Sequence, residues 1–163
     1  PALFRQRRVG ENGRFFDMLK FRTMYVDADE RKDEVLEETE SGEVIHKRKD
    51  DPRVTSVGRI LRRTSFDELP QFFNVLKGEM SLVGPRPCLF NQQELIAERA
   101  ARNVFDARPG ITGLAQVNAI DMSTPKLLAK TDQQMLHSLS LRSYFRYILM
   151  TLMGKGAGDR VSG

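Results

Sequence analysis

The segment 51–87 constrains the fold most strongly, because its prolines and glycines limit where helices can begin and end. Pro70 has no amide hydrogen and is tolerated only near the start of a helix, whereas Gly78 is a typical residue just past a helix end. The sequence therefore predicts a helix that runs towards Lys77 and stops at Gly78. A Gly-Pro-Arg-Pro turn follows at residues 84–87, and its prolines make the backbone there stiff.

Two adjacent carboxylates, Asp67 and Glu68, stand at the predicted start of this helix. Ser65 and Glu68 match the S-x-x-E capping box, in which each side chain satisfies a free backbone amide of the first turn. The amides and the dipole at a helix N-terminus stabilise negative charge, on a carboxylate or on a bound phosphate. Such a start is common in ordinary helices, so capping alone explains this fragment taken by itself.

Three arginines near these carboxylates favour a phosphate site. Arg62 and Arg63 precede the carboxylates, and Arg86 lies between the two prolines of the stiff turn. The planar guanidinium of arginine suits bidentate recognition of phosphate, especially where the backbone is fixed. A carboxylate held beside such arginines is either repelled by an anionic ligand or placed to attack it.

This stretch resembles the core motif of the bacterial sugar transferase family, the monotopic phosphoglycosyl transferases that start the synthesis of cell-surface glycans. The matching segments occur in the family's order and cover most of the chain from Phe4 to Val117. They are residues 20–24, 57–59, 62, 64–71, 74–78, 80–87, 108–113 and 116–117.

The resemblance implies transfer of a sugar phosphate from a UDP-sugar to a polyprenyl phosphate, here undecaprenyl phosphate, with release of UMP. It assigns Asp67 as the nucleophile that attacks the phosphorus bearing the sugar and forms an aspartyl-phosphosugar intermediate. Glu68 is expected to assist, either by holding a divalent cation or by acting on the incoming acceptor. Mg²⁺ is the natural ion for carboxylate and diphosphate oxygens, with Asp67 and Glu68 as its protein ligands.

Four cations are candidates for binding the phosphates of the substrates. Arg86 ranks first, because its flanking prolines fix its backbone and the family has an arginine at this place. Arg62, five residues before the nucleophile, and Lys20 are candidates for contacting phosphate or balancing charge in the active site. Arg108 lies in a segment that resembles the family's loop near the nucleotide, although surface solvation also explains it.

Two features of the resemblance concern the sugar and the membrane. Residues 118–163 resemble the short members of the family that act on N-acetylated sugars, which points to an N-acetylated donor. In the family, a hydrophobic helix that dips into one leaflet precedes the hairpin. Since this helix is missing ahead of residues 1–24, we expect the chain to be the catalytic domain without its anchor, or an unusual member that lacks it. The resemblance implies a position at the cytoplasmic face of the bacterial inner membrane.

Charge is distributed unevenly along the 163 residues. The net charge is +4, but residues 25–50 carry ten acidic and five basic side chains, so the rest of the chain is distinctly basic. Basic surface suits phosphate ligands, anionic lipids or nucleic acid. Nucleic acid is disfavoured, because the arginines cluster beside acids and lack interleaved aromatic residues. Cys88 is the single cysteine and is expected to pack in the core, and neither histidine has the neighbours of a transition-metal site.

The remaining patterns predict one α+β domain over residues 1–163, mostly helical around a small sheet. An Asn-Gly pair at residues 12–13 predicts a hairpin within residues 1–24. Predicted helices cover residues 27–43, 58–63, 89–105, 124–137 and 141–153. Predicted strands cover residues 54–57 and 114–117, and residues 108–113 are expected to form a loop.

The last predicted helix, 141–153, is apolar over most of its circumference and carries Arg142 and Arg146 four residues apart. It is too short to span a bilayer, which takes about 20 residues, but it suits a helix that lies on a membrane surface. A core helix whose arginines reach out to solvent explains the pattern equally well.

Two other functions stay open from the sequence. A phosphohydrolase with Asp67 as its nucleophile would use water in place of a lipid acceptor and would release free sugar phosphate. A non-catalytic module would bind the membrane surface through the basic face and the last helix.

Overall fold

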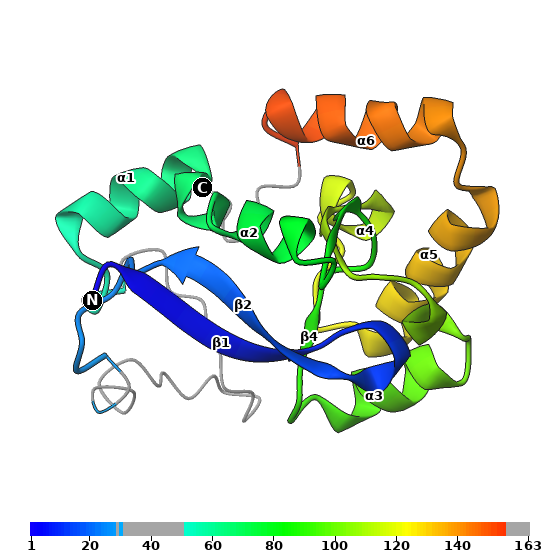
Figure 1. Ribbon diagram of the computed structural model, residues 1–163, viewed down its shortest axis with the longest axis horizontal. Coiled ribbons are helices and arrows are strands. Elements are labelled where there is room, and N and C mark those ends of the chain that lie inside the picture. The colour runs from blue at the N-terminus through cyan, green and yellow to red at the C-terminus, as the bar shows by residue number, and fades with distance from the viewer. Residues whose placement is uncertain (29, 31–50, 156–163) are drawn as a thin grey trace, which may run out of the picture.

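The computed structural model of the chain describes residues 1–28, 30 and 51–155 and confirms the α+β architecture. Two small β-sheets lie among the helices. Figure 1 shows α1, α2 and α6 along one side of the molecule, whereas α3 and α5 lie at one end. Most of the helix predicted over residues 27–43 falls outside the described residues.

The N-terminal hairpin forms as predicted. β1 (Leu3–Val9) and β2 (Phe15–Phe21) pair in antiparallel fashion over their whole length. The connection is a short 3-10 helix, Glu11–Gly13, in which Asn12 has a φ of 54° and Gly13 a φ of 71°. Asn and Gly adopt this left-handed conformation more easily than other residues, which is why this pair forms the turn.

Short strands from later in the chain complete the two sheets. β4 (Cys88–Leu89) pairs with the other edge of β1, so the first sheet has the order β2-β1-β4. β3 (Ser81–Val83) and β5 (Gly110–Thr112) form a separate parallel pair. A Cβ atom on Gly110 would lie 2.0 Å from the amide nitrogen of Gly84, so this crossing of two backbones requires glycine.

Two predictions around these strands are wrong. The predicted loop 108–113 contains β5, and the predicted strand 114–117 is a short helix, α4 (Leu114–Val117). A run of four residues is too short for its apolar pattern to separate a strand from a helix. The strand β5 forms because it pairs with β3, a contact about 30 residues distant that no local pattern indicates.

The last two helices confirm their predictions. α5 (Pro125–Ser138) begins with proline at its first position, although the side chain of Thr124 makes no capping hydrogen bond. α6 (Leu141–Leu152) begins at a capping box in which Ser140 and Ser143 bond each other's backbone amides. None of the helices in the described ranges is long and apolar enough to cross a bilayer.

The helix predicted over residues 89–105 is shorter in the structure. α3 (Gln93–Ala100) starts late because Leu89 pairs with β1 instead of joining the helix. It ends early because Asn103 takes a left-handed conformation, with a φ of 55°, and leads into the 3-10 turn Val104–Asp106.

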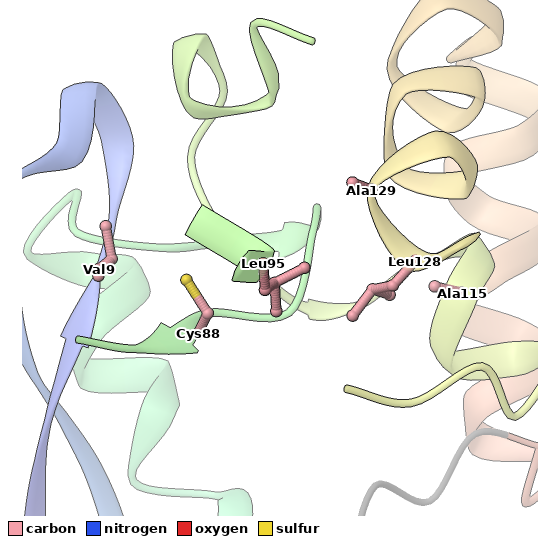
Figure 2. Close-up of a cluster of buried hydrophobic side chains, with 6 residues drawn as sticks. All are labelled: Val9, Cys88, Leu95, Ala115, Leu128 and Ala129. Carbon is pink, nitrogen blue, oxygen red and sulfur yellow. The ribbon is translucent and has the colours of Figure 1, made fainter. Parts of the chain in front are cut away.

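The main core lies where the hairpin meets α3, α4 and α5, as Figure 2 shows. A second cluster joins β3 and α4 to α5 and α6. Burial raises the pKa of the Cys88 thiol, so this side chain packs as a small apolar group, as predicted. The first cluster consists of Val9, Cys88, Leu95, Ala115, Leu128 and Ala129, and the second of Val83, Val117, Met135 and Tyr147.

Candidate active site

The segment that carries the carboxylates differs from its prediction. Ser65 does not cap a following helix: it ends α1 (Ser56–Thr64) in a left-handed conformation, with a φ of 58°, and makes no side-chain capping bond. Phe66–Glu68 then forms a 3-10 turn, and α2 (Gln71–Leu76) starts directly after Pro70. The predicted capping box is therefore wrong, whereas the position of Pro70 at the helix start is confirmed.

A single buried asparagine fastens α2 to the hairpin. The Oδ1 atom of Asn74 accepts a hydrogen bond from the amide of Leu19 at 3.0 Å, and its Nδ2 atom donates to the carbonyl of Asp17 at 2.9 Å. Nδ2 also donates to the carboxylate of Glu79 at 2.7 Å. The side-chain amide thus satisfies the edge of β2 much as a neighbouring strand would, and it places the carboxylate turn beside β2.

The start of α1 is tied to the chain just after β2. Thr55 caps this helix and its own amide bonds the carbonyl of Thr23 at 3.0 Å. A Cβ atom on Gly58 would lie 2.0 Å from that same carbonyl, so glycine permits the close approach. Only Val54 of the predicted strand 54–57 makes a β-bridge, because the helix already begins at residue 56. Arg62 donates from Nε to the Thr23 hydroxyl at 2.9 Å.

These contacts bring Glu68 between two of the predicted phosphate-binding cations. Its Oε1 atom lies 3.3 Å from Nζ of Lys20 and 3.2 Å from Nη2 of Arg86. All three side chains are at least four-fifths buried, so water screens their charges less than on an open surface. Two cations sharing one carboxylate oxygen form a site that suits a phosphate group.

Asp67 lies in the same 3-10 turn and is only 4% exposed. Arg62 approaches the group through Thr23, three residues after Lys20 in the chain. The structure therefore brings four of the six predicted site residues to one turn, Lys20, Asp67, Glu68 and Arg86, whereas the Arg62 side chain bonds Thr23.

Arg108 is the exception. Its guanidinium lies 3.5 Å from the carboxylate of Glu11, in the turn of the hairpin, and both side chains are largely exposed. Strands rise about 3.3 Å per residue, so Val9 lies roughly 17 Å along β1 from Phe4, the residue that pairs with Lys20, and Glu11 follows in the turn beyond Val9. The exposed ion pair agrees with the surface role that the sequence also allowed.

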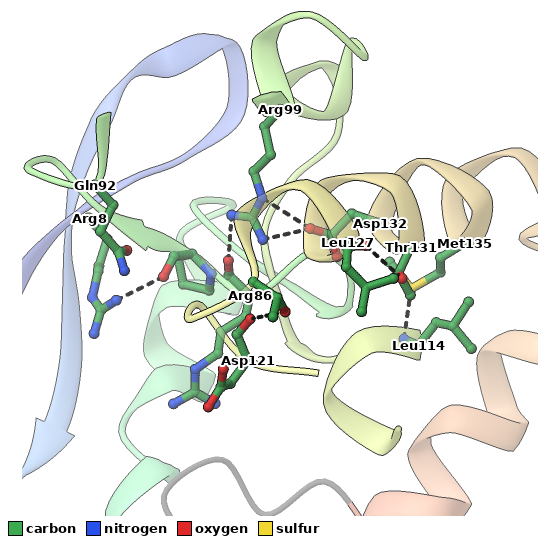
Figure 3. Close-up of polar contacts among 12 residues, drawn as sticks. Arg8, Arg86, Gln92, Arg99, Leu114, Asp121, Leu127, Thr131, Asp132 and Met135 are labelled. Carbon is green, nitrogen blue, oxygen red and sulfur yellow. Dashed lines mark hydrogen bonds and ion pairs between the residues drawn. The ribbon is translucent and has the colours of Figure 1, made fainter. Parts of the chain in front are cut away.

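The turn that carries Arg86 is held through three successive carbonyl groups, two of which Figure 3 shows. The carbonyl of Pro85 accepts from the amide of Gly110 at 2.9 Å. The carbonyl of Arg86 accepts from Nη1 of Arg99 at 2.8 Å, and that of Pro87 from Nη1 of Arg8 at 2.9 Å. The rigidity predicted from the prolines is thus reinforced by contacts from the hairpin, from α3 and from β5.

Sequence reasoning missed the buried arginine Arg99 and its partner Asp132. Nε and Nη2 of Arg99 donate to Oδ2 of Asp132 at 3.0 Å and 2.7 Å, and both side chains are almost fully buried. A signal was available: Arg99 stands four residues after the buried Leu95, and Asp132 four residues after the buried Leu128. A charged residue on the apolar side of each of two helices indicates a buried pair.

The two adjacent carboxylates, Asp67 and Glu68, are of the residue type that Mg²⁺ takes as ligands. Within residues 1–28, 30 and 51–155, no group of three or more His, Cys, Asp and Glu side chains is placed to hold a metal ion. Mg²⁺ is commonly held by one or two carboxylates, with phosphate oxygens and water as its other ligands. Asp67 and Glu68 therefore match the donor set of an ion that arrives with a diphosphate.

Comparison with known proteins gives consistent matches. A family model described as bacterial sugar transferase matches residues 1–155. The galactosyl transferase CpsE of Streptococcus agalactiae is 43% identical over 162 residues, which cover 96% of this chain and 36% of that protein. The undecaprenyl-phosphate galactose phosphotransferase of Salmonella typhimurium is 44% identical over 135 residues, 76% of this chain and 27% of the relative.

A third relative is named for its donor as well as its acceptor. The UDP-glucose:undecaprenyl-phosphate glucose-1-phosphate transferase of Caulobacter vibrioides is 48% identical over 124 residues, which cover 74% of this chain and 42% of that protein. The matched part of the chain thus spans well under half the length of each of these three relatives.

Proposed function

This chain belongs to the bacterial sugar transferase family, and from that premise we propose that it transfers a sugar phosphate from a UDP-sugar to undecaprenyl phosphate and releases UMP. The observation that carries the proposal is the position of Glu68 between Lys20 and Arg86, next to Asp67 in one turn. The names of two relatives, which mention undecaprenyl phosphate, support the acceptor, and one of them mentions a UDP-sugar.

In the proposed first step, an oxygen of the Asp67 carboxylate forms a bond to the phosphorus that carries the sugar. The bond from this phosphorus to the bridging oxygen breaks, and UMP leaves with the electron pair. Lys20 and Arg86 bind the non-bridging phosphate oxygens, so that the anionic nucleophile can approach an anionic substrate. Because Asp67 is buried, the attack takes place away from bulk water, which disfavours hydrolysis.

In the proposed second step, a phosphate oxygen of undecaprenyl phosphate forms a bond to the same phosphorus. The bond between this phosphorus and Asp67 breaks, which restores the carboxylate and yields undecaprenyl diphosphate sugar. No proton has to be transferred for either step to balance. The two steps use one site in turn, which is a ping-pong cycle.

Asp67 and Glu68 are the proposed ligands of Mg²⁺. When bound, the ion would neutralise part of the diphosphate charge and orient its oxygens. Glu68 is well placed for this role because Lys20 and Arg86 already fix its Oε1 atom beside the expected phosphate position.

Exposed apolar side chains on α1, α2 and α6 support a position at a membrane surface. Figure 1 shows these three helices along one side of the molecule, and the turn Phe66–Glu68 connects α1 to α2 in the chain. One side of α6 packs on the second core cluster through Tyr144, Tyr147, Ile148 and Met150, and the opposite apolar side is exposed. The exposed residues are Val57, Ile60, Phe66, Leu69, Phe72, Phe73, Leu76, Leu141, Phe145, Leu149, Leu152 and Met153.

We expect weak, salt-sensitive binding to anionic liposomes through this surface, since each exposed cation adds about 1 kcal/mol near an anionic bilayer. Flotation of the Arg142→Glu/Arg146→Glu variant should show reduced binding at low salt. The matched control is Lys126→Glu/Lys130→Glu, which makes the same charge change at exposed positions of α5. Equal binding by both double variants would remove α6 from the membrane contact.

The donor sugar is open to a direct test. The sequence favoured an N-acetylated sugar, whereas the relatives are named for galactose and glucose. The protein should be incubated with Mg²⁺, undecaprenyl phosphate and each of UDP-galactose, UDP-glucose and UDP-N-acetylglucosamine, and UMP release should be measured. The proposed cycle releases at most one UMP per protein without the lipid, so continued release that requires the lipid supports the transferase. Continued release of UMP with free sugar phosphate when the lipid is omitted supports the hydrolase.

A further inference from the structure

The turn that carries Arg86 rests on a buried ion pair between α3 and α5. We propose that Arg99, with Asp132 as its counter-ion, is a positioning residue that sets where the Arg86 guanidinium meets phosphate. The inference rests on the phosphate-binding role proposed for Arg86. Arg99 and Asp132 would thus act on the site from the core, without touching the substrate.

The contacts of Arg99 use two edges of its guanidinium. Nε and Nη2 donate to one oxygen of Asp132, while Nη1 donates to the carbonyl of Arg86 at 2.8 Å (Figure 3). Arg99 and Asp132 are each 1% exposed. The carboxylate thus fixes the plane of the guanidinium, and the guanidinium fixes the backbone from which Arg86 extends.

The Arg86 turn needs such donors because of its own sequence. Pro85 and Pro87 have no amide hydrogen, so neither can anchor the turn by donating a hydrogen bond. The amide of Gly84 donates to the carbonyl of Thr112, and the carbonyls of the next three residues accept from Gly110, Arg99 and Arg8. Of these donors, Arg99 is the one that acts on the residue whose side chain reaches Glu68.

Stability alone does not explain a charged pair at this place. A buried ion pair is often no more stable than well-packed apolar residues of the same size. Burial raises the pKa of the Asp132 carboxyl, and its Oδ1 atom is buried without a hydrogen-bond partner in the part of the chain that the structure describes. An apolar pair would remove both penalties, but it could not donate to the carbonyl of Arg86.

That difference separates a positioning role from a structural one. The variant Arg99→Met/Asp132→Leu should fold with a melting temperature close to that of the parent protein, because it leaves no unpaired buried charge. Its kcat/KM should nevertheless fall about tenfold to a hundredfold, the effect of losing a hydrogen bond from a charged donor to an active-site group. The matched control is Arg102→Met, since the guanidinium of Arg102, just past the end of α3, bonds Glu98.

A double-mutant cycle tests whether Arg99 acts through Arg86. In the parent protein, Arg86→Ala should lower kcat/KM by the whole contribution of the Arg86 side chain. In the Arg99→Met/Asp132→Leu background, the same substitution should lower it little further, because the guanidinium is already misplaced. Factors that multiply independently would overturn the proposal.

Hydrogen exchange supplies a readout that does not depend on turnover. In Arg99→Met/Asp132→Leu, amides in residues 84–89 should exchange faster than in the parent, whereas those of β1 and β2 should be unchanged. Asp132→Asn, which keeps an acceptor for Arg99, should give a smaller change in the same segment. Unchanged exchange at residues 84–89 would overturn the positioning role. A parent protein without transferase activity but with the predicted exchange would contradict the proposed function, while Arg99 would still be shown to fix the Arg86 turn.

Discussion

The two sides of the candidate site are built in different ways. Arg86 projects from a turn whose flanking residues Gly84, Pro85, Pro87 and Cys88 are all buried and whose carbonyls are bound from three elements. The carboxylates lie in a short turn between two small helices whose apolar side chains, from Phe66 to Leu76, face solvent. The Arg86 turn therefore belongs to the core, whereas Asp67, although itself buried, lies in a turn whose neighbouring apolar side chains are exposed.

This contrast matches the two substrates of the proposed reaction. A soluble nucleotide sugar requires a fixed array of cations, because catalysis depends on donors that are already in place. A lipid acceptor has to be met at an apolar surface, and the carboxylate turn is where such a surface adjoins the cations. The fold thus places the Arg86 turn in the core and the carboxylate turn beside an exposed apolar surface.

Leucine truncations on the two sides should give the largest difference. Leu95→Ala, in the core behind the Arg86 turn, should lower the free energy of unfolding by about 2–5 kcal/mol through loss of burial and creation of a cavity. Leu76→Ala, on the exposed side of α2, should change it by less than about 0.5 kcal/mol. Urea denaturation of the two variants makes the measurement. Similar losses in both would show that α2 is packed against something in solution.

Arg86 itself should tolerate no replacement by lysine. An ammonium group cannot reproduce the planar fork, so Arg86→Lys should reduce kcat/KM about tenfold to a hundredfold with little change in melting temperature. Steady-state kinetics on the donor, at saturating lipid, give the value. Arg108→Lys is the control, because that guanidinium lies in an exposed ion pair with Glu11. Full activity in Arg86→Lys would reduce Arg86 to a structural turn residue.

A smaller effect on the free energy of unfolding is expected at Asp51, which helps to join the segment before α1 to the segment after β2. Asp51 binds the guanidinium and the amide of Arg53, and the amide of Tyr25 in turn donates to the carbonyl of Arg53. The hydrogen bond from Arg53 lowers the pKa of the Asp51 carboxyl below its ordinary value. The stabilisation is therefore present above the unfolded-state pKa of about 3.9, and it is lost as the pH falls through the lower folded-state pKa.

The variant Asp51→Asn tests this pH dependence. At pH 7 it should lower the free energy of unfolding by roughly 1 kcal/mol, and the difference from the parent should shrink as the pH falls below about 4. Denaturation curves of both proteins at several pH values give the comparison. A difference that stays constant down to pH 3 would mean that the ionised carboxylate is not the source of the stabilisation.

Local sequence patterns predicted those elements whose cause is local. The Asn-Gly turn, the proline at the start of α5 and the serine cap of α6 each act within a few residues, and these elements formed as predicted. The capping box failed because Ser65 is used to end α1, and a motif of four residues does not say which helix a serine belongs to. The strand β5 was missed because its pairing with β3 is a long-range contact.

The candidate site also combines features that the sequence indicated with long-range contacts that it did not. The resemblance to a known family singled out Asp67, Glu68, Arg86 and Lys20, which lie at one turn in the structure, and Arg62, which bonds Thr23. The sequence did not indicate the residues that hold the carboxylate turn and the Arg86 turn in place. Arg8 bonds a carbonyl 79 residues away, and Asn74 bonds β2 from 55 and 57 residues away. Such contacts depend on how the elements pack, which composition and periodicity do not specify.

The central claim is that Asp67 carries the sugar phosphate before the lipid acceptor reacts, and the mass of the intact protein tests it most directly. With UDP-sugar and Mg²⁺ but without undecaprenyl phosphate, the protein should gain the mass of one sugar phosphate after rapid quenching. The adduct should map to Asp67, should disappear when undecaprenyl phosphate is added, and should not form in Asp67→Asn. A protein that turns over with the lipid present yet never shows the adduct, or an Asp67→Asn variant that retains turnover, would contradict the account.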